Sequence, residues 1–173
     1  MVWNAQADWE ALERALVGFD NGAVVALCDD LVRRLYAESE PYPTGPAKKL
    51  LNRLRTRRFF AQMERIADAL IQTGAQTPGV RRLYAQALLD QGHFTVALQV
   101  LDALIADTQD SDRQENAEAR GLKGRAYKQM YINARAPGVQ RNQRWLDNAA
   151  IAYHGPYASE PDSEDDWCRL RHE

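Results

Sequence analysis

The sequence predicts an all-α fold in which about four helix pairs stack into a right-handed α-solenoid. Apolar residues recur at helical spacing through most of the chain, and the strict alternation typical of β-strands is absent. Short breaks rich in glycine, proline or polar residues divide this pattern into segments of helical length. Similar short motifs return about every 35 residues, which is the length of one helix pair in a repeat protein.

Two helices and a loop are predicted at the N-terminal end. The first helix carries an apolar stripe over residues 9–19 behind Asp8, whose side chain is expected to cap it. The second helix carries its stripe over residues 24–35. Residues 40–46 contain three prolines and a glycine, which cannot continue a helix, so a loop is predicted there.

The next two helices are predicted from stripes over residues 50–54 and 59–70. Gly74 is expected just beyond the end of the fourth helix, where a left-handed backbone conformation favours glycine. Thr77 and Pro78 then predict a new helix start, with threonine as N-cap and proline at the first helical position. This fifth helix is expected to stop at Gly92.

The C-terminal half supplies three more helices. Apolar positions over residues 94–105 predict the sixth, and a polar run separates it from a seventh helix around residues 115–131. Ala136, Pro137 and Gly138 break the chain. An eighth helix is expected from about Trp145, fading near Gly155 and Pro156.

Domain boundaries follow from this pattern. Residues 1–158 are expected to form one helical repeat domain, and residues 159–173 an acidic connection followed by the start of a helix. Trp167 to Glu173 looks like that start, which suggests a truncated chain or one module of a larger protein. A solenoid normally ends in a polar capping helix, so an uncapped end would favour self-association.

The repeat appears when helix pairs are aligned by sequence. Residues 25–27, Val-Ala-Leu, resemble residues 96–98, with Gln62 and Met63 falling between them at spacings of about 35 residues. An unrelated helical bundle could match one such unit by chance, but concerted matches favour a repeat. The tetratricopeptide pattern requires small, large, small, aromatic and small residues, then a residue that closes the second helix. In the best unit these positions hold Ala85, Leu88, Gly92, Phe94, Ala97 and Leu104.

A second motif is more specific. Residues 118–131 read EARGLKGRAYKQMY and place Gly121 and Gly124 inside one helical pattern, where they lower stability unless close packing requires them. This segment resembles the Gly-Leu-x-Gly-Arg-x-Tyr-Lys segment of bacterial tetratricopeptide proteins related to the TRAF-binding region of stress-activated kinase kinase kinases. The resemblance covers nearly the whole chain. It implies a signalling or conflict-related scaffold, of a kind often joined to protease, caspase-like or adaptor domains.

Composition excludes few functions but favours an ordinary cytoplasmic, bacterial protein. The 22 basic and 24 acidic residues give a formal net charge of -2, which does not require a polyanionic partner. Cys28 and Cys168 lie far apart without metal-ligand spacing, so neither a disulfide framework nor a zinc site is indicated. No signal peptide or membrane-spanning run is present in the sequence, and we expect no membrane partner.

Catalysis is not indicated. No nucleophile with a base, paired acid and base, or metal-ligand cluster stands out, and the three histidines, His93, His154 and His172, fall at turns or ends. Gly121 and Gly124 lie in a helical pattern with no preceding strand, so they do not indicate a phosphate-binding loop. We therefore expect neither an enzyme nor a cofactor nor a bound metal.

Protein binding is the predicted function. In such arrays the first helix of each pair lines the inner surface, and its exposed side chains contact a bound peptide or domain. Aligning Ala85 with Gly124 selects long, mostly donating side chains, which could hold carboxylates or backbone carbonyls. The alternative is a regulatory module of a larger signalling or conflict-system protein, which controls a protease-like or other effector domain. The predicted partner-binding residues are Arg82, Gln86, Asp90, Arg125, Lys128 and Gln129.

A basic segment is the strongest local charge feature. Residues 48–58 hold six basic side chains, and its candidate patch comprises Lys48, Lys49, Arg53 and Arg55. A solvated helix face is the simplest interpretation, and an acidic protein partner or nucleic acid are the alternatives. The protein is favoured over nucleic acid because aromatic residues are not interleaved with the basic ones. The sequence leaves the partner and the oligomeric state open.

Overall fold

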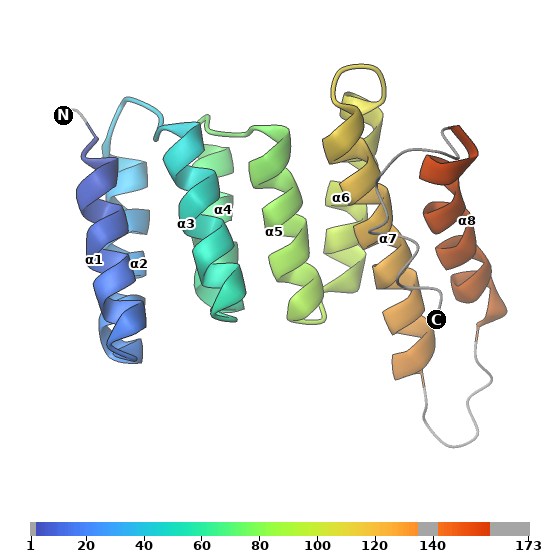
Figure 1. Ribbon diagram of the computed structural model, residues 1–173, viewed down its shortest axis with the longest axis horizontal. Helices are drawn as coiled ribbons and strands as arrows, with labels where there is room; N and C mark the ends of the chain where they lie inside the picture. The colour runs from blue at the N-terminus through green and yellow to red at the C-terminus, as the bar shows by residue number, and fades with distance from the viewer. Residues whose placement is uncertain (1–2, 135–141, 160–173) are drawn as a thin grey trace. The chain divides into compact units, whose positions relative to one another are not determined.

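The computed structural model describes residues 3–134 and 142–159, with the side chains of 155–159 excepted (Figure 1). Within these residues the chain forms eight helices and no strands, which confirms the predicted all-α fold. The helices are α1 (Ala5–Val17), α2 (Asn21–Ala37), α3 (Thr44–Thr56), α4 (Phe60–Gln72), α5 (Pro78–Asp90), α6 (Phe94–Thr108), α7 (Arg113–Asn133) and α8 (Gln143–Ser159).

The chain divides into two compact units, which we call unit 1 (Met1–His93) and unit 2 (Phe94–Glu173). Unit 1 holds α1 to α5 and unit 2 holds α6 to α8. The boundary falls between α5 and α6, inside the helix pair that the sequence pattern marks most clearly.

Unit 1 is a two-layer arrangement of antiparallel helices (Figure 1). Helix α3 contacts α1 and α5 in one layer, and α2 contacts α4 in the other. Helix α4 also contacts α3 and α5, and α1 contacts α2, so the two layers are joined along their length. First helices of successive pairs thus pack on first helices, and second on second, as in tetratricopeptide-like repeats.

A continuous apolar core lies between these layers. Leu51, Leu54, Met63 and Leu83 are completely or almost completely buried in it, together with many further leucines. Burying each such side chain contributes about 1.5 to 3 kcal/mol. Alanines at 0 % exposure, among them Ala67, let the helix backbones approach closely. The core is therefore made of large side chains interleaved with small ones, as the repeat pattern predicts.

Four of the interhelical turns in unit 1 share one hydrogen-bond pattern. Each has a single residue at positive φ, followed by a residue whose backbone N–H donates to the carbonyl five residues earlier, as in a Schellman motif. Gly74 and Gly92 take the left-handed position as the sequence predicts, with φ of 96° and 86°. The other two such turns place Phe19 and Arg58 there, at φ of 55° and 62°.

Two predicted helix starts are wrong. Asn4, not Asp8, is the N-cap of α1, and its side chain accepts a hydrogen bond from the Ala7 amide. Asp8 lies in the first turn, where it accepts hydrogen bonds from Arg34 of α2 and from Tyr42 in the connection between α2 and α3. Helix α3 begins at Thr44, inside the segment predicted as a loop. Pro46 is its third residue, and a first-turn proline sacrifices no intrahelical hydrogen bond.

Unit 2 packs α7 against both α6 and α8. Helix α8 continues through Gly155 and Pro156 to Ser159, beyond the predicted end. The buried apolar residues of unit 2, in its described part, are mostly small: Ala97, Leu101, Leu104, Ala119, Leu122, Ala126, Ala149 and Ala152. The predictions for the acidic run, for Trp167 and Cys168 and for His172 lie outside the described residues.

Candidate functional site

Helix α7 carries the glycine motif and is fixed on both sides by packing. Asp112 caps its N-terminus by accepting a hydrogen bond from the Glu115 amide. On one side a β-carbon at Gly124 would lie 2.9 Å from the ring of Tyr153 in α8. Only glycine lets the two helices approach so closely. The motif glycine at 124 therefore serves helix packing, as the sequence suggested, and sets the distance between α7 and α8.

A cavity of about 160 Å³ opens in unit 2 between α6, α7 and α8. Arg120, Lys123 and Tyr127 line it from α7, at a spacing that places them on one face of the helix. All three belong to the motif segment 118–131. The remaining lining is mainly apolar: Ile105 from α6, and Asn148, Ile151 and Ala152 from α8. Ile151 is 70 % exposed, which places it at the rim.

A buried polar chain holds Arg120 in place. Its Nε–H donates to the side-chain oxygen of Asn116 over 2.8 Å. The Asn116 amide nitrogen donates in turn to the Ile105 carbonyl at 2.8 Å and to the Thr108 hydroxyl at 3.1 Å. Thr108 is 1 % exposed and donates to the Leu104 carbonyl. Because these buried groups satisfy one another, they fix the plane of the guanidinium at the cavity wall.

The second cation at the cavity is paired with a carboxylate of α6. Lys123 Nζ lies 2.5 Å from Asp102 Oδ1. The Lys123 side chain is 28 % exposed and that of Asp102 is 54 % exposed, so the pair lies at the surface and is partly screened by water. The cavity thus combines two cations, a phenol and an amide with apolar walls. Such a mixture of apolar surface and a few directed polar groups is typical of binding sites.

The cavity of unit 2 lies within the part of the chain that matches a known family. The family model described as Tetratricopeptide Repeats-Sensor matches residues 54–170, about two thirds of the chain. The chain belongs to this family. No curated protein and no solved structure matches the chain significantly. The matched region contains all residues that line the cavity, and excludes α1 and α2.

Membership in the Tetratricopeptide Repeats-Sensor family establishes the repeat type that the sequence predicted. Repeats of this type generally form non-catalytic scaffolds for protein interaction. Among the described residues, no group of three or more His, Cys, Asp or Glu side chains is arranged to hold a metal ion. No helix in the described ranges is both long and apolar enough to span a bilayer.

The predicted partner-binding residues of unit 2 lie on α7, but on another side of it. Arg125 is half-buried, whereas Lys128 and Gln129 are exposed, and Gln129 donates to Asn133. A helix turns about 100° per residue, so these positions face away from Arg120 and its neighbours on the cavity wall. The cavity residues Arg120, Lys123 and Tyr127 were missed as a site. Their spacing within the motif was the available signal.

The predicted residues of unit 1 do not form an exposed row. Arg82 is only 9 % exposed, so the expectation of an exposed side chain is wrong. Helix α5 is buried around most of its circumference because it packs on both α3 and α4. Gln86 is half-buried and accepts a hydrogen bond from Arg55 at 3.4 Å. Asp90 is half-buried and has a partner within the chain.

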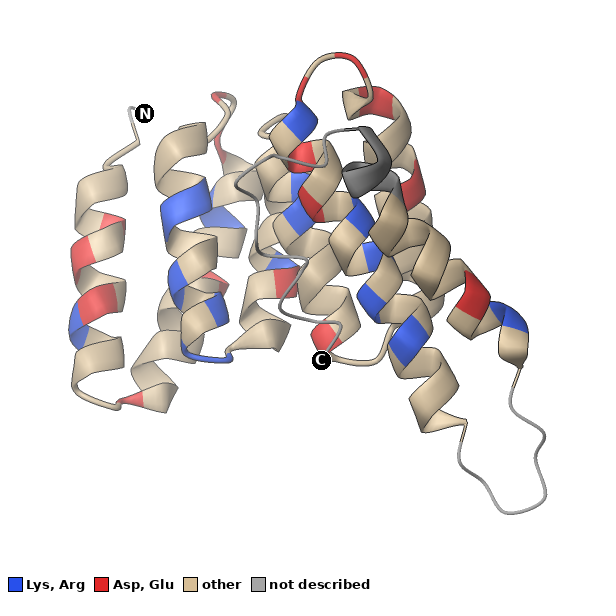
Figure 2. Cartoon of the chain, turned by 45° about the vertical axis from the view of Figure 1, so that its right-hand side comes forward, with Lys and Arg blue, Asp and Glu red and all other residues tan. Residues whose placement is uncertain are grey.

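The basic patch is largely engaged within unit 1. Arg53 donates two hydrogen bonds to the Glu13 carboxylate, at 2.6 and 2.7 Å, and joins α3 to α1. Lys49 Nζ lies 3.9 Å from the ring centroid of Trp9, a cation–π contact between the same helices. Lys48 is exposed and has a partner in the chain. Basic bands of α3 accordingly face acidic bands of α1 (Figure 2), so this surface is less available to nucleic acid than the sequence suggested.

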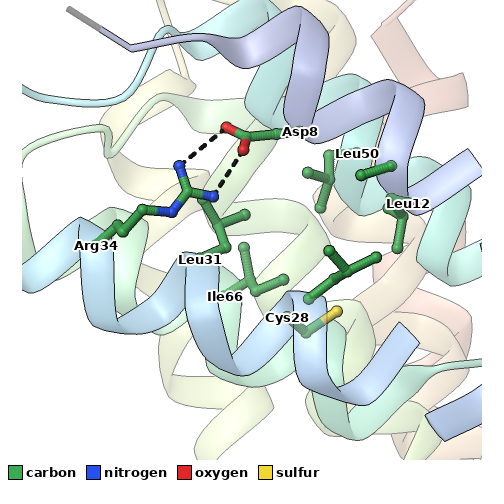
Figure 3. Close-up of a pocket in the computed structure, with 9 residues that line it drawn as sticks. Asp8, Leu12, Cys28, Leu31, Arg34, Leu50 and Ile66 are labelled. Atoms are coloured by element: carbon green, nitrogen blue, oxygen red, sulfur yellow. Dashed lines mark hydrogen bonds and ion pairs between the residues drawn. The ribbon is translucent and has the colours of Figure 1, made fainter. Parts of the chain in front are cut away.

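A second, smaller cavity lies inside unit 1. It measures about 30 Å³, enough for one or two water molecules, and is lined by Leu12, Leu31, Leu50, Ile66 and Cys28 (Figure 3). Arg34 and Asp8 close one end of this cavity, where Arg34 Nη2 donates a hydrogen bond to Asp8 Oδ1 over 2.6 Å. Cys28 is buried, and this burial raises the pKa of its thiol to about 12, so the thiol stays protonated at neutral pH.

Proposed function

We propose that the chain is a recognition module whose binding site for a partner protein is the α7 cavity of unit 2, which we define by Arg120, Lys123 and Tyr127 with Ile105, Asn148, Ile151 and Ala152. The observation that carries this proposal is the coincidence of the cavity with the motif helix. Three side chains of that helix meet in one concave surface of about 160 Å³. The helices that form it are ordered before binding, so most of the ordering cost falls on the partner.

The family description supports the regulatory form of this function. A sensor responds to what it binds, so occupancy of the α7 cavity would be passed on to a signalling protein or to a domain joined to this one. The resemblance to bacterial relatives of the kinase kinase kinase region favours the same setting. Partner binding through Arg125, Lys128 and Gln129 is the second candidate, because Lys128 and Gln129 are exposed on the same helix.

One capture experiment separates the two surfaces of α7. The chain is used as bait in lysate of the source cell as wild type, Lys123→Gln and Lys128→Gln. Both variants remove one lysine charge from the same helix, and circular dichroism checks that each stays helical. The α7 cavity is supported if one protein is captured by wild type and Lys128→Gln but lost from Lys123→Gln. The reverse pattern moves the site to the Lys128 surface, and no specific capture contradicts protein recognition.

A further inference from the structure

We infer that the α7 cavity takes a carboxylate on a short apolar stem, supplied by an acidic side chain of the partner protein. This inference rests on the proposed function and specifies its chemistry. The volume of the cavity limits the size of the group that it can hold. An apolar cavity of about 150 Å³ holds one benzene molecule. The α7 cavity of about 160 Å³ therefore accepts a single side-chain-sized group and not a larger ligand as a whole.

The polar and apolar groups that line the cavity indicate the chemistry of the ligand. Arg120, Lys123 and Tyr127 present donors from α7, and Asn148 adds an amide from α8. Ile105 and Ile151 supply apolar surface from the two flanking helices. A ligand that satisfies both kinds of surface has an anionic head group and an apolar stem. An aspartate or glutamate side chain is such a group, and a guanidinium binds carboxylates in its own plane.

Net charge distinguishes a carboxylate from a doubly charged phosphate. Arg120 and Lys123 bring two positive charges to the cavity, and Asp102 beside Lys123 brings one negative charge. One net positive charge remains, which matches a monoanion. A dianion would be paired with half of the countercharge that it needs, and desolvating the excess charge is unfavourable.

Asp102 already shows how a carboxylate binds here. Its Oδ1 lies 2.5 Å from Lys123 Nζ, the position that an incoming carboxylate would take. Because Asp102 is 54 % exposed, its carboxylate can release Lys123 by turning toward water when a ligand arrives, while it stays beside the cavity and keeps the local net charge at one positive. Exposed ion pairs contribute about 1 kcal/mol or less, so this exchange is inexpensive. Asp102 is therefore an internal competitor that keeps Lys123 neutralised while the cavity is empty.

The direct test is a nuclear magnetic resonance titration of the whole chain with butyrate, a carboxylate on a three-carbon stem. Butyramide has nearly the same shape without the charge, and inorganic phosphate supplies a dianion. All titrations are made at one ionic strength set with chloride. We expect saturable amide shifts in α7 and α8 with butyrate, with butyramide at least about tenfold weaker. Equal binding of butyramide, or tighter binding of phosphate, overturns the inference.

Variants then assign the side chains. Tyr127→Phe keeps the cavity shape and Arg120→Gln removes a cation; each is expected to weaken butyrate about fivefold. Asp102→Asn is expected to tighten it about threefold to fivefold, because Lys123 no longer has a competitor. Lys128→Gln, outside the cavity, should leave affinity unchanged. A weaker affinity of Asp102→Asn for butyrate overturns the competitor role. Tighter binding by this variant cannot result from misfolding, because loss of structure only weakens binding.

Competition identifies the source of the carboxylate. Butyrate at saturation should release the protein captured in a Lys123-dependent manner. If butyrate binds but that protein stays, the source is not the partner's side chain and the inference fails. If butyrate binds and no protein is captured at all, the proposed protein recognition fails while the carboxylate site remains. If capture depends on Lys123 but butyrate does not bind, protein recognition stands and the carboxylate inference fails.

Discussion

Gly124 lies under the ring of Tyr153, with ring atoms Cε1 and Cζ 2.9 Å from where a β-carbon at residue 124 would be. Gly121, one turn earlier in α7, is also buried, yet a β-carbon there would meet no atom within 4 Å. The two glycines of the motif are thus unlike. One is required by close packing of α7 on α8, and the other only weakens the helix.

Replacing each glycine with alanine should therefore have opposite effects on stability. Gly124→Ala is expected to lower the free energy of unfolding by about 1 to 3 kcal/mol, because the methyl group displaces the Tyr153 ring. Gly121→Ala should raise it by about 0.5 to 1 kcal/mol through helix propensity. Urea unfolding followed by circular dichroism measures both. Equal losses in the two variants would contradict this difference in packing.

The shared turn pattern of unit 1 allows a matched comparison of backbone strain. Arg58 holds the left-handed position at φ 62°, where glycine is favoured, so Arg58→Gly is expected to raise the free energy of unfolding by about 0.5 to 1 kcal/mol. Gly92→Ala places a β-carbon in open space at φ 86° and should lower it by about 1 kcal/mol, for conformational reasons alone. Thermal unfolding of both proteins is the measurement. Destabilisation by Arg58→Gly would show that its contact with Phe60 outweighs the strain.

The ion pair between Glu13 and Arg53 should contribute measurably to the packing of α1 on α3. Its side chains are only 33 % and 24 % exposed and share two hydrogen bonds. A double-mutant cycle with Glu13→Gln and Arg53→Gln is expected to give a coupling free energy of about 0.5 to 1 kcal/mol, smaller in high salt. Asp30 and Arg33, which pair at 44 % and 76 % exposure, are the control. Similar coupling in both cycles would refute a special role for the Glu13 pair.

Unit 1 should lose stability at alkaline pH. Burial raises the pKa of the Cys28 thiol from 9.0 to about 12, and burial beside Asp8 raises the pKa of the Tyr42 hydroxyl above its usual value. Unfolding lets both groups ionise at their ordinary pKa. Stability is therefore fully retained below pH 9 and falls as pH rises from 9 toward 12. Denaturant unfolding at several pH values checks this fall. Cys28→Ala and Tyr42→Phe should each flatten it, and an unchanged slope in the double variant would contradict the assignment.

Local rules predicted the fold better than the site. Gly74 and Gly92 could be placed in left-handed turns because the signal lies within a few residues of each. The role of Asp8 could not be predicted from nearby residues, because its hydrogen-bond partners Arg34 and Tyr42 are 26 and 34 residues away in sequence. The burial of Arg82 likewise depends on how α5 packs between its neighbours.

The α7 cavity shows the same limit. The spacing of Arg120, Lys123 and Tyr127 places them on one helix face, which sequence reasoning could have used. The concave shape comes from α6 and α8, whose lining residues are at least 15 residues away in sequence from those of α7. Only the packed structure shows that these elements leave a space beside that face.

Small side chains in the core of unit 2 have a thermodynamic consequence. Five of its eight buried apolar residues in the described part are alanines, whereas only seven of the 24 in the described part of unit 1 are alanines and eleven are leucines. Alanine removes less apolar area from water, so transient opening of α6, α7 and α8 requires less work than opening of unit 1. A ligand that binds only the closed form of these helices slows hydrogen exchange of their amides in proportion to its saturation. The occupied state is then distinguished from the empty one by its protection, even where the helices keep the same positions.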